Sequence, residues 1–153
     1  MVRKPGHKVR YAVVGLGHIA QVAVLPAFSH AARNSHLAAL VSGNRNKLRE
    51  LGRRYRVEHS YTYDEYDDCL NSGEIDAVYI ALPNSMHAEY SIRAAEAGIH
   101  VLVEKPMAVT EKECLAMIRA ASKHRVKLMV AYRLHFEQAN LKAIELANSG
   151  KLG

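Results

Sequence analysis

The segment from Gly15 to Ala20 reads Gly-Leu-Gly-His-Ile-Ala, with small residues at the spacing that a dinucleotide pyrophosphate needs. Gly15 can adopt the angles of a sharp strand-to-helix turn. Gly17 has no Cβ, so free N–H groups at a helix start can approach the phosphates. The alternative is a plain turn in an α/β core. An apolar run before the motif and an apolar-periodic segment after it favour the nucleotide. The predicted cofactor residues in this turn are Gly15, Leu16, Gly17, His18 and Ile19.

A hydroxyl, an amide and two cations follow the next apolar run, and no Asp or Glu occurs between Val41 and Arg49. An acidic side chain here would bind a free ribose 2′-hydroxyl and repel a 2′-phosphate. Its absence, together with the cations, favours NADP over NAD as the cofactor. These residues could also cap a helix and point to water, and both interpretations can hold at once. The predicted cofactor residues here are Ser42, Gly43, Asn44, Arg45 and Lys47.

A third polar turn comes after the apolar run Ala77–Leu82, where a nicotinamide ribose would pass. Asn84 can donate hydrogen bonds to ribose hydroxyls and accept them. His87 lies three positions further on, and a structural hydrogen-bonding role for it is favoured over acid or base chemistry. The predicted cofactor residues in this turn are Leu82, Pro83, Asn84 and His87.

The tripeptide Glu104-Lys105-Pro106 places an ammonium group between the end of a predicted strand and a proline. There Lys105 could bind a substrate hydroxyl or stabilise developing alkoxide charge. An isolated lysine can equally be a surface charge. The sequence leaves the isomer of the Lys105–Pro106 bond open, because most such bonds are trans but cis occurs before proline.

Alternating apolar runs and helical segments must position these turns. The predicted strands are 9–14, 36–41, 57–61, 77–82, 100–103 and 128–131, and the predicted helices are 19–32, 45–55, 64–70, 85–97, 110–123 and 137–148. Pro26 is expected to bend or shorten the first helix. Thr110 and Glu113 have the spacing of a capping box.

Such alternation along the whole chain predicts a parallel sheet with right-handed crossovers. We therefore expect one dinucleotide-binding domain over residues 1–153. Its expected architecture is a doubly wound Rossmann fold, with a mostly parallel sheet of about six strands and helices on both faces. The ligand crevice should lie at the carboxyl ends of the strands, where all the polar turns above are found.

Composition narrows the class of protein further. The chain has 153 residues, of which 49% are hydrophobic and 24% charged, a globular balance. No apolar run is long enough for a membrane span and no signal core precedes the first strand, so we expect a cytoplasmic location and no membrane partner. Cys69 and Cys114 lack ligands at metal spacing, so we expect free thiols and no metal.

The formal net charge of +6 raises the possibility of nucleic-acid binding. The densest basic run lies between Arg45 and Arg56. Its single aromatic residue is Tyr55, next to its end, and no nucleic-acid module surrounds it, so it is better explained as the solvated face of a helix. We therefore expect no nucleic-acid partner.

The chain resembles the Gfo/Idh/MocA oxidoreductases over nearly its whole length. The resemblance rests on Gly15-Leu16-Gly17, on the segment from Ala81 to His87, and on the segment from Ala97 to Ala108. Ser42-Gly43-Asn44, with Tyr132-Arg133 after the last predicted strand, is similar to the glucose-fructose oxidoreductase branch.

The resemblance implies an NAD(P)-dependent sugar or cyclitol dehydrogenase that moves hydride between a carbinol carbon and nicotinamide. It implies that Lys105 contacts the reacting substrate hydroxyl, that Glu104 and Lys105 also border the cofactor, and that Arg133 lies near the nicotinamide or substrate. The branch uses NADP, in agreement with the interpretation of Ser42 and Lys47.

The resemblance also implies a second domain that supplies most of the substrate pocket, the oligomer interface and an Asp-x-x-x-His or tyrosine-containing catalytic segment. The chain ends at Gly153, where that domain would begin. We therefore expect an NADP-binding domain that is inactive or nearly so alone and meets a sugar-like substrate only with a C-terminal domain. Exposed apolar area could let it form a homo-oligomer. The alternative is a stand-alone NADP-binding or sensing module without turnover.

Overall fold

The computed structural model describes residues 8–150, so the chain ends 1–7 and 151–153, which the expected domain includes, lie outside the described residues. Six parallel strands form one sheet in the order β3-β2-β1-β4-β5-β6. The strands are β1 (Val9–Val14), β2 (Ser35–Val41), β3 (His59–Tyr61), β4 (Ala77–Ile80), β5 (His100–Glu104) and β6 (Leu128–Ala131). The predicted doubly wound fold is confirmed, and among the described strands the sheet is entirely parallel rather than mostly so.

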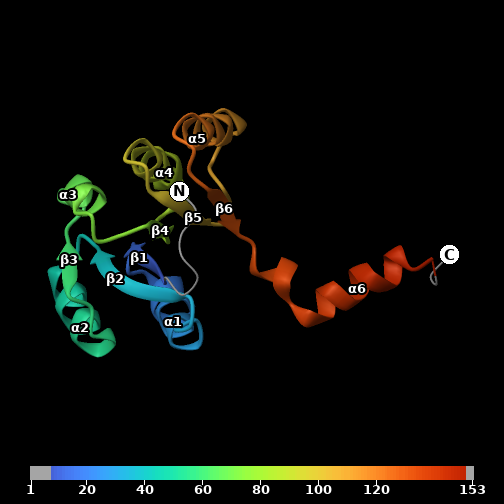
Figure 1. Cartoon of the computed structure of the whole chain (residues 1–153), viewed down its shortest axis with the longest axis horizontal. Helices are drawn as coiled ribbons and strands as arrows, with labels where there is room; N and C mark the ends of the chain where they lie inside the picture. Colours follow the sequence, from blue (N-terminus) through green and yellow to red (C-terminus); the bar gives the residue numbers. More distant parts are fainter. Residues whose placement is uncertain (1–7, 151–153) are drawn as a thin grey trace.

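Helices cover the two faces in the way that right-handed crossovers require (Figure 1). The helices are α1 (Leu25–His30), α2 (Arg45–Tyr55), α3 (Tyr66–Asn71), α4 (His87–Glu96), α5 (Glu111–Lys123) and α6 (Gln138–Asn148). Helices α1 and α2 lie on one face, and α3, α4 and α5 lie on the other (Figure 1). The chain runs outward from β1 to β3 and then returns to β4, so the strand order reverses between β1 and β4. Ligands bind at such a switch point in doubly wound sheets.

The core is divided between the two faces of the sheet. One apolar cluster joins the sheet to α3, α4 and α5, and includes the fully buried side chains of Tyr66, Ile80 and Met117. The other joins it to α1 and α2 and includes Leu25 and Leu40. The predicted capping box is present at the start of α5, where Thr110 Oγ1 accepts from the Glu113 N–H and the Glu113 carboxylate accepts from the Thr110 N–H.

Several predicted boundaries differ from the structure, and three of them adjoin the polar turns. The helix expected over 19–32 begins with a π-helical turn, Ala20–Val24 (η1), before α1. Pro26 stands in the first turn of α1, where its missing N–H costs no hydrogen bond. Strand β4 ends at Ile80, two residues earlier than the apolar run indicated. The next helix begins with a 3-10 turn, Asn84–Met86 (η2), before α4.

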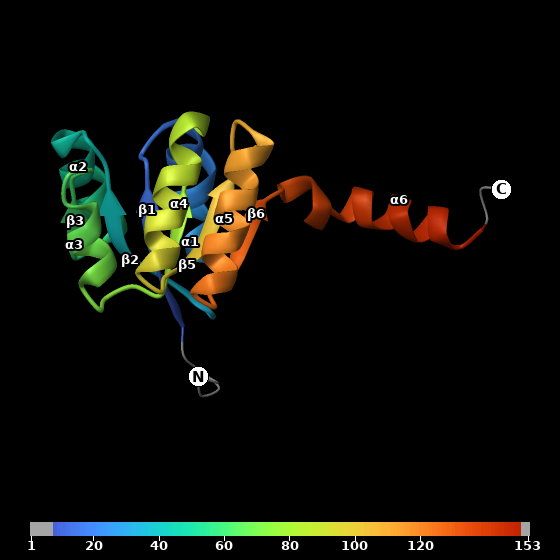
Figure 2. The same cartoon turned by 90° about the horizontal axis from the view of Figure 1, so that it is seen from above.

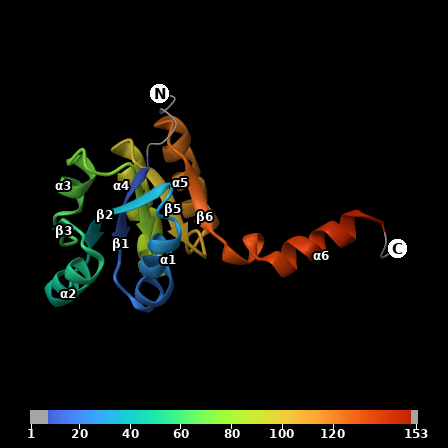
Figure 3. The ribbon, with the colours of Figure 1, turned by 60° about the horizontal axis from the view of Figure 1, so that its bottom comes forward.

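The chain leaves the domain after β6. A 3-10 turn, Arg133–Phe136 (η3), leads into α6, which projects away from the sheet and its helices (Figures 2 and 3). None of the residues of α6 is buried. The side chains of Tyr132, Leu134 and Phe136 are 56%, 57% and 60% exposed. This end of the molecule therefore presents apolar area to solvent.

Within residues 8–150, no helix has the length and apolar character needed to cross a membrane. No group of three or more His, Cys, Asp or Glu side chains within that range could hold a metal ion. Cys69 is buried, Cys114 is partly buried, and both are free thiols. Burial raises the pKa of the Cys69 thiol to about 12, which keeps it protonated and unreactive.

Candidate functional site

A hollow of about 340 Å³ lies where the first, second and fourth strands end. This hollow lies at the switch point of the sheet, and three of the four predicted polar turns contribute to its lining. Its lining residues are Gly15, Leu16, Gly17, Ser42, Gly43, Asn44, Lys47, Tyr63, Ala81, Leu82 and Pro83. We call it the nucleotide hollow.

The first glycine of the turn is required by the protein's own backbone. Gly15 has a φ of +93°, and a Cβ built on it would lie 2.6 Å from the Ala81 carbonyl oxygen. Its N–H donates to the Val41 carbonyl at 2.9 Å, which ties the turn to β2. Gly15 therefore allows the end of β1 to pass between its two neighbouring strands.

The second glycine has a different environment. A Cβ on Gly17 would meet nothing within 4 Å, and Gly17 is exposed at the edge of the nucleotide hollow. Nothing in the protein itself excludes a side chain there, so the open space suits a ligand that approaches the main chain. Behind it, Ala20 is fully buried against the sheet, as predicted.

The end of β2 carries the polar side chains that were expected to face a 2′-phosphate. Asn44 caps α2, with its Oδ1 accepting from the N–H groups of Asn46 and Lys47 at 3.0 Å each. Ser42 is buried, and its hydroxyl accepts from the Asn44 N–H at 3.2 Å. The Lys47 ammonium reaches across the hollow and donates to the Leu16 carbonyl at 3.2 Å. Asn44 therefore caps α2 and also lines the hollow, so both interpretations of this turn hold for it.

Tyr63 also lines the hollow, and the sequence analysis did not select it. Its ring lies 3.2 Å from the position that a Cβ on Gly43 would occupy, so Gly43 gives the ring room. Tyr63 follows β3 as Ser42 follows β2. Its position just after a short predicted strand could have identified Tyr63 as a residue of the site.

Other predicted cofactor residues lie outside the lining of this hollow. They are His18, Ile19, Arg45, Asn84, His87, Glu104, Lys105 and Arg133. His18, Arg45 and Asn84 are exposed beside it. Arg45 and Asn84 begin α2 and η2, and His18 lies two residues before η1. Ile19 packs against the apolar cluster under α1 and α2. Its side chain therefore belongs to the core.

Lys105 lies at the end of β5, on an open shelf of about 580 Å³. The lining residues of this lysine shelf are Glu104, Lys105, Ala131, Tyr132, Arg133, Leu134 and Glu137. Lys105 and the residues from Tyr132 to Glu137 are exposed. The bond between Lys105 and Pro106 is cis. The structure thus brings Lys105, Glu104 and Arg133 together in the lining of the shelf, which the glycine turn does not share.

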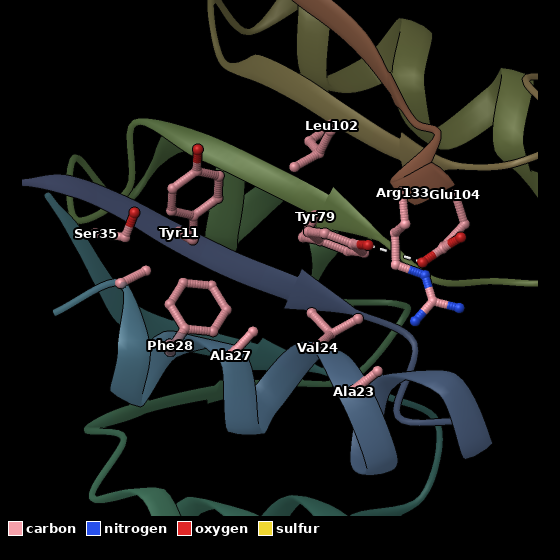
Figure 4. A pocket seen from close by; sticks show the side chains of 11 residues that line it. Tyr11, Ala23, Val24, Ala27, Phe28, Ser35, Tyr79, Leu102, Glu104 and Arg133 are labelled. Atoms are coloured by element: carbon pink, nitrogen blue, oxygen red, sulfur yellow. Dashed lines mark hydrogen bonds between the residues drawn. The ribbon is translucent and has the colours of Figure 1, made fainter. Parts of the chain in front are cut away.

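A groove of about 370 Å³ continues from the shelf along the α1 side of the sheet (Figure 4). Glu104 lies at its head, largely buried, where its carboxylate accepts a hydrogen bond from the Tyr79 hydroxyl at 2.7 Å. Burial and the Glu104 carboxylate raise the pKa of the Tyr79 hydroxyl, although Arg133 lowers it. Tyr79 therefore remains the protonated donor. Figure 4 shows Arg133 at this same end of the groove.

His87 is fully buried at the start of α4. Its Nδ1 lies 2.8 Å from the Pro106 carbonyl oxygen, and its Nε2 lies 2.9 Å from the Leu82 carbonyl oxygen. Both ring nitrogens face backbone carbonyl oxygens, and a neutral ring donates to one of them. These contacts agree with the favoured structural hydrogen-bonding role, and the contact of His87 with a cofactor stays a prediction.

Comparison with known proteins shows what shares this arrangement. A family model described as an oxidoreductase family with an NAD-binding Rossmann fold matches residues 9–132. Among curated proteins, a D-xylose 1-dehydrogenase [NADP(+)] from Haloarcula marismortui is 36% identical over 146 residues, which are 95% of this chain and 40% of that protein.

Two solved structures extend the comparison. An aldose-aldose oxidoreductase from Caulobacter crescentus, complexed with glycerol, matches with a TM-score of 0.89 and 43% identity, over 94% of this chain and 43% of that one. A 3-ketoreductase from Actinomadura kijaniata, in complex with TDP-benzene and NADP, matches with a TM-score of 0.84 and 26% identity, over 94% of this chain and 44% of that one. The chain spans about two fifths of the length of these relatives.

Proposed function

The chain belongs to the Gfo/Idh/MocA oxidoreductase family and has its NAD-binding Rossmann domain, and from this premise we propose that it binds NADP in preference to NAD. The observation that carries the proposal is the Lys47 ammonium in the nucleotide hollow, beside the Ser42 and Asn44 end of β2. None of the described residues that line that hollow carries a carboxylate. A 2′-phosphate would find a cation and a hydroxyl there and no like charge.

The described residues fit a dinucleotide. The open space over Gly17 and the N–H groups at the start of η1 suit a pyrophosphate, and the Ser42–Lys47 turn suits the adenosine ribose with its phosphate. Two relatives support the choice of NADP, because the xylose dehydrogenase is named for it and the ketoreductase was solved with it.

We further propose that the domain serves the oxidation or reduction of a sugar-like or cyclitol alcohol. Bound NADP(H) would supply or accept the hydride. Lys105 would hold the reacting hydroxyl with its ammonium group and stabilise the negative charge that develops on that oxygen. Support comes from the position of Lys105 at the carboxyl end of β5, and from the sugar substrates named for the xylose and aldose enzymes.

We also propose that this chain alone has little or no turnover. Lys105 stands on a shelf whose far side, from Tyr132 to Glu137, is exposed. A substrate there would be held from one side and remain in water, which weakens the electrostatic stabilisation on which such catalysis depends. The apolar side chains exposed from β6 to α6 support an interface at this end, with a further domain or with another copy of the chain.

The test is a Lys47→Glu variant, titrated with NADPH and with NADH. A reversed charge beside the 2′-phosphate should weaken NADPH roughly ten- to a hundredfold, the worth of a lost charge-assisted hydrogen bond. Loss of the contact to Leu16 affects both cofactors alike, so NADH measures that part separately.

The matched control is Arg49→Glu, which makes the same charge change on an exposed position of α2 that does not line the hollow. It should reduce the affinity for NADPH by no more than about threefold, since exposed charges are screened. Equal losses of NADPH and NADH affinity in Lys47→Glu would remove the 2′-phosphate assignment.

A further inference from the structure

Lys105 stands between two side chain contacts that fix the residues before and after it. On the N-terminal side, the Glu104 carboxylate accepts from the Tyr79 hydroxyl at 2.7 Å. Tyr79 belongs to β4, which pairs with β5 in register, so this contact joins neighbouring strands where they end. Glu104 is largely buried, and a buried carboxylate that loses its donor leaves a costly unpaired group.

On the C-terminal side, the Pro106 carbonyl is held by His87 Nδ1 at 2.8 Å. The other ring nitrogen faces the Leu82 carbonyl at 2.9 Å, and Leu82 is part of the wall of the nucleotide hollow. A carbonyl oxygen only accepts, so each contact is a hydrogen bond when the ring nitrogen that makes it carries hydrogen. One buried ring thus spans the hollow and the segment 104–109, which we call the lysine loop.

We infer that Tyr79 and His87 are positioning residues, which hold the backbone on either side of Lys105 and fix its placement relative to the nucleotide hollow. Neither side chain needs to touch substrate. Both come from β4 and the start of α4, the segment that also carries the wall of the hollow. The inference rests on the proposed function for the chemical role of Lys105, but the restraint itself is a property of this chain alone.

The experiment measures hydrogen exchange of the backbone amides of the lysine loop, which all its residues except Pro106 carry, without nucleotide, in the wild-type chain and in Tyr79→Phe. This substitution removes one hydroxyl and keeps the ring. Exchange in the loop should become roughly three- to tenfold faster, the effect expected when one hydrogen bond no longer opposes local opening. Exchange in α2 should be unchanged.

Tyr66→Phe is the matched control. Tyr66 is a buried tyrosine whose hydroxyl donates to a backbone carbonyl, that of Tyr90 at 3.1 Å. Tyr90 lies in α4, outside the lysine loop. The same chemical change there should leave exchange at 104–109 at the wild-type rate. Any general loss of stability from deleting a buried hydroxyl is thereby measured separately.

His87 is tested with two substitutions. His87→Leu removes both ring nitrogens and should speed exchange in the loop at least as much as Tyr79→Phe. His87→Gln retains an amide donor and should restore part of the protection. If both fail to fold, Tyr79→Phe and its control still decide the role of the first contact.

The inference is overturned if Tyr79→Phe leaves exchange at 104–109 at the rate of the Tyr66→Phe control, or if exchange rises equally in α2. These results do not depend on whether NADPH binds. Failure of the proposed function would appear in the titrations, and failure of the positioning role in the exchange rates.

Discussion

The nucleotide hollow and the lysine shelf lie at the same edge of one sheet, yet they are built differently. The hollow is walled by the ends of β1, β2 and β4, and its turns are tied to one another by backbone hydrogen bonds, such as Gly15 to Val41 and Ala81 to Val14. The shelf has Lys105 and Glu104 on one side, and exposed residues of η3 on the other. From this comparison we propose that the chain by itself completes a site for the nucleotide and supplies one side of a site for chemistry.

The largest expected effect comes from Gly15→Ala, in the wall of the hollow. Its Cβ would lie 2.6 Å from a backbone oxygen of Ala81, and the residue would keep a left-handed φ. Backbone strain and the clash should together lower the free energy of unfolding by about 3 kcal/mol and abolish measurable NADPH binding. Thermal unfolding and a titration would check this, and a wild-type melting temperature would contradict it.

Gly17→Ala sharpens the comparison, because the added Cβ meets no protein atom within 4 Å. The variant should be as stable as the wild type to within about 0.5 kcal/mol. Its affinity for NADPH should still fall at least about tenfold, because the Cβ keeps the main chain away from the pyrophosphate. Undiminished binding would show that Gly17 is not at the phosphates.

For the lysine shelf we expect the opposite pattern, in which a substitution lowers turnover and leaves the affinity for NADPH nearly unchanged. Lys105→Ala should change the affinity of this chain for NADPH by no more than about twofold, since Lys105 does not line the hollow. In a longer version with turnover, the same change should lower kcat roughly a hundredfold or more. Lys112→Ala, at an exposed lysine near the start of α5, is the control. An unchanged kcat in Lys105→Ala would remove its catalytic role.

Sequence patterns were sufficient for the sheet and for most of the hollow. The alternation of strands and helices indicates the fold, and the turns that end β1, β2 and β4 each have a local signature in Gly, Asn or Pro. These features depend on residues close together in the chain. The boundaries that differed include η1, which directly precedes the turn of α1 that contains Pro26, and the end of β4, next to Ala81, whose carbonyl faces Gly15.

The contacts around Lys105 could not be found in this way. Tyr79 and Glu104 are 25 positions apart, and His87 and Pro106 are 19 apart, so neither pair leaves a periodic signal. The residues next to them in the sequence are those of an ordinary buried strand or helix start, so they do not mark these contacts either. Only the parallel register of β4 and β5 and the packing of α4 bring these groups together.

The most direct test of the account is a calorimetric titration of this 153-residue chain with NADPH and, side by side, with NADH at moderate salt. The account predicts clear binding of NADPH, with NADH at least about tenfold weaker, because the 2′-phosphate meets Lys47. No binding of either cofactor would contradict the claim that this chain completes the nucleotide site. Equal binding of both would contradict the assignment of NADP.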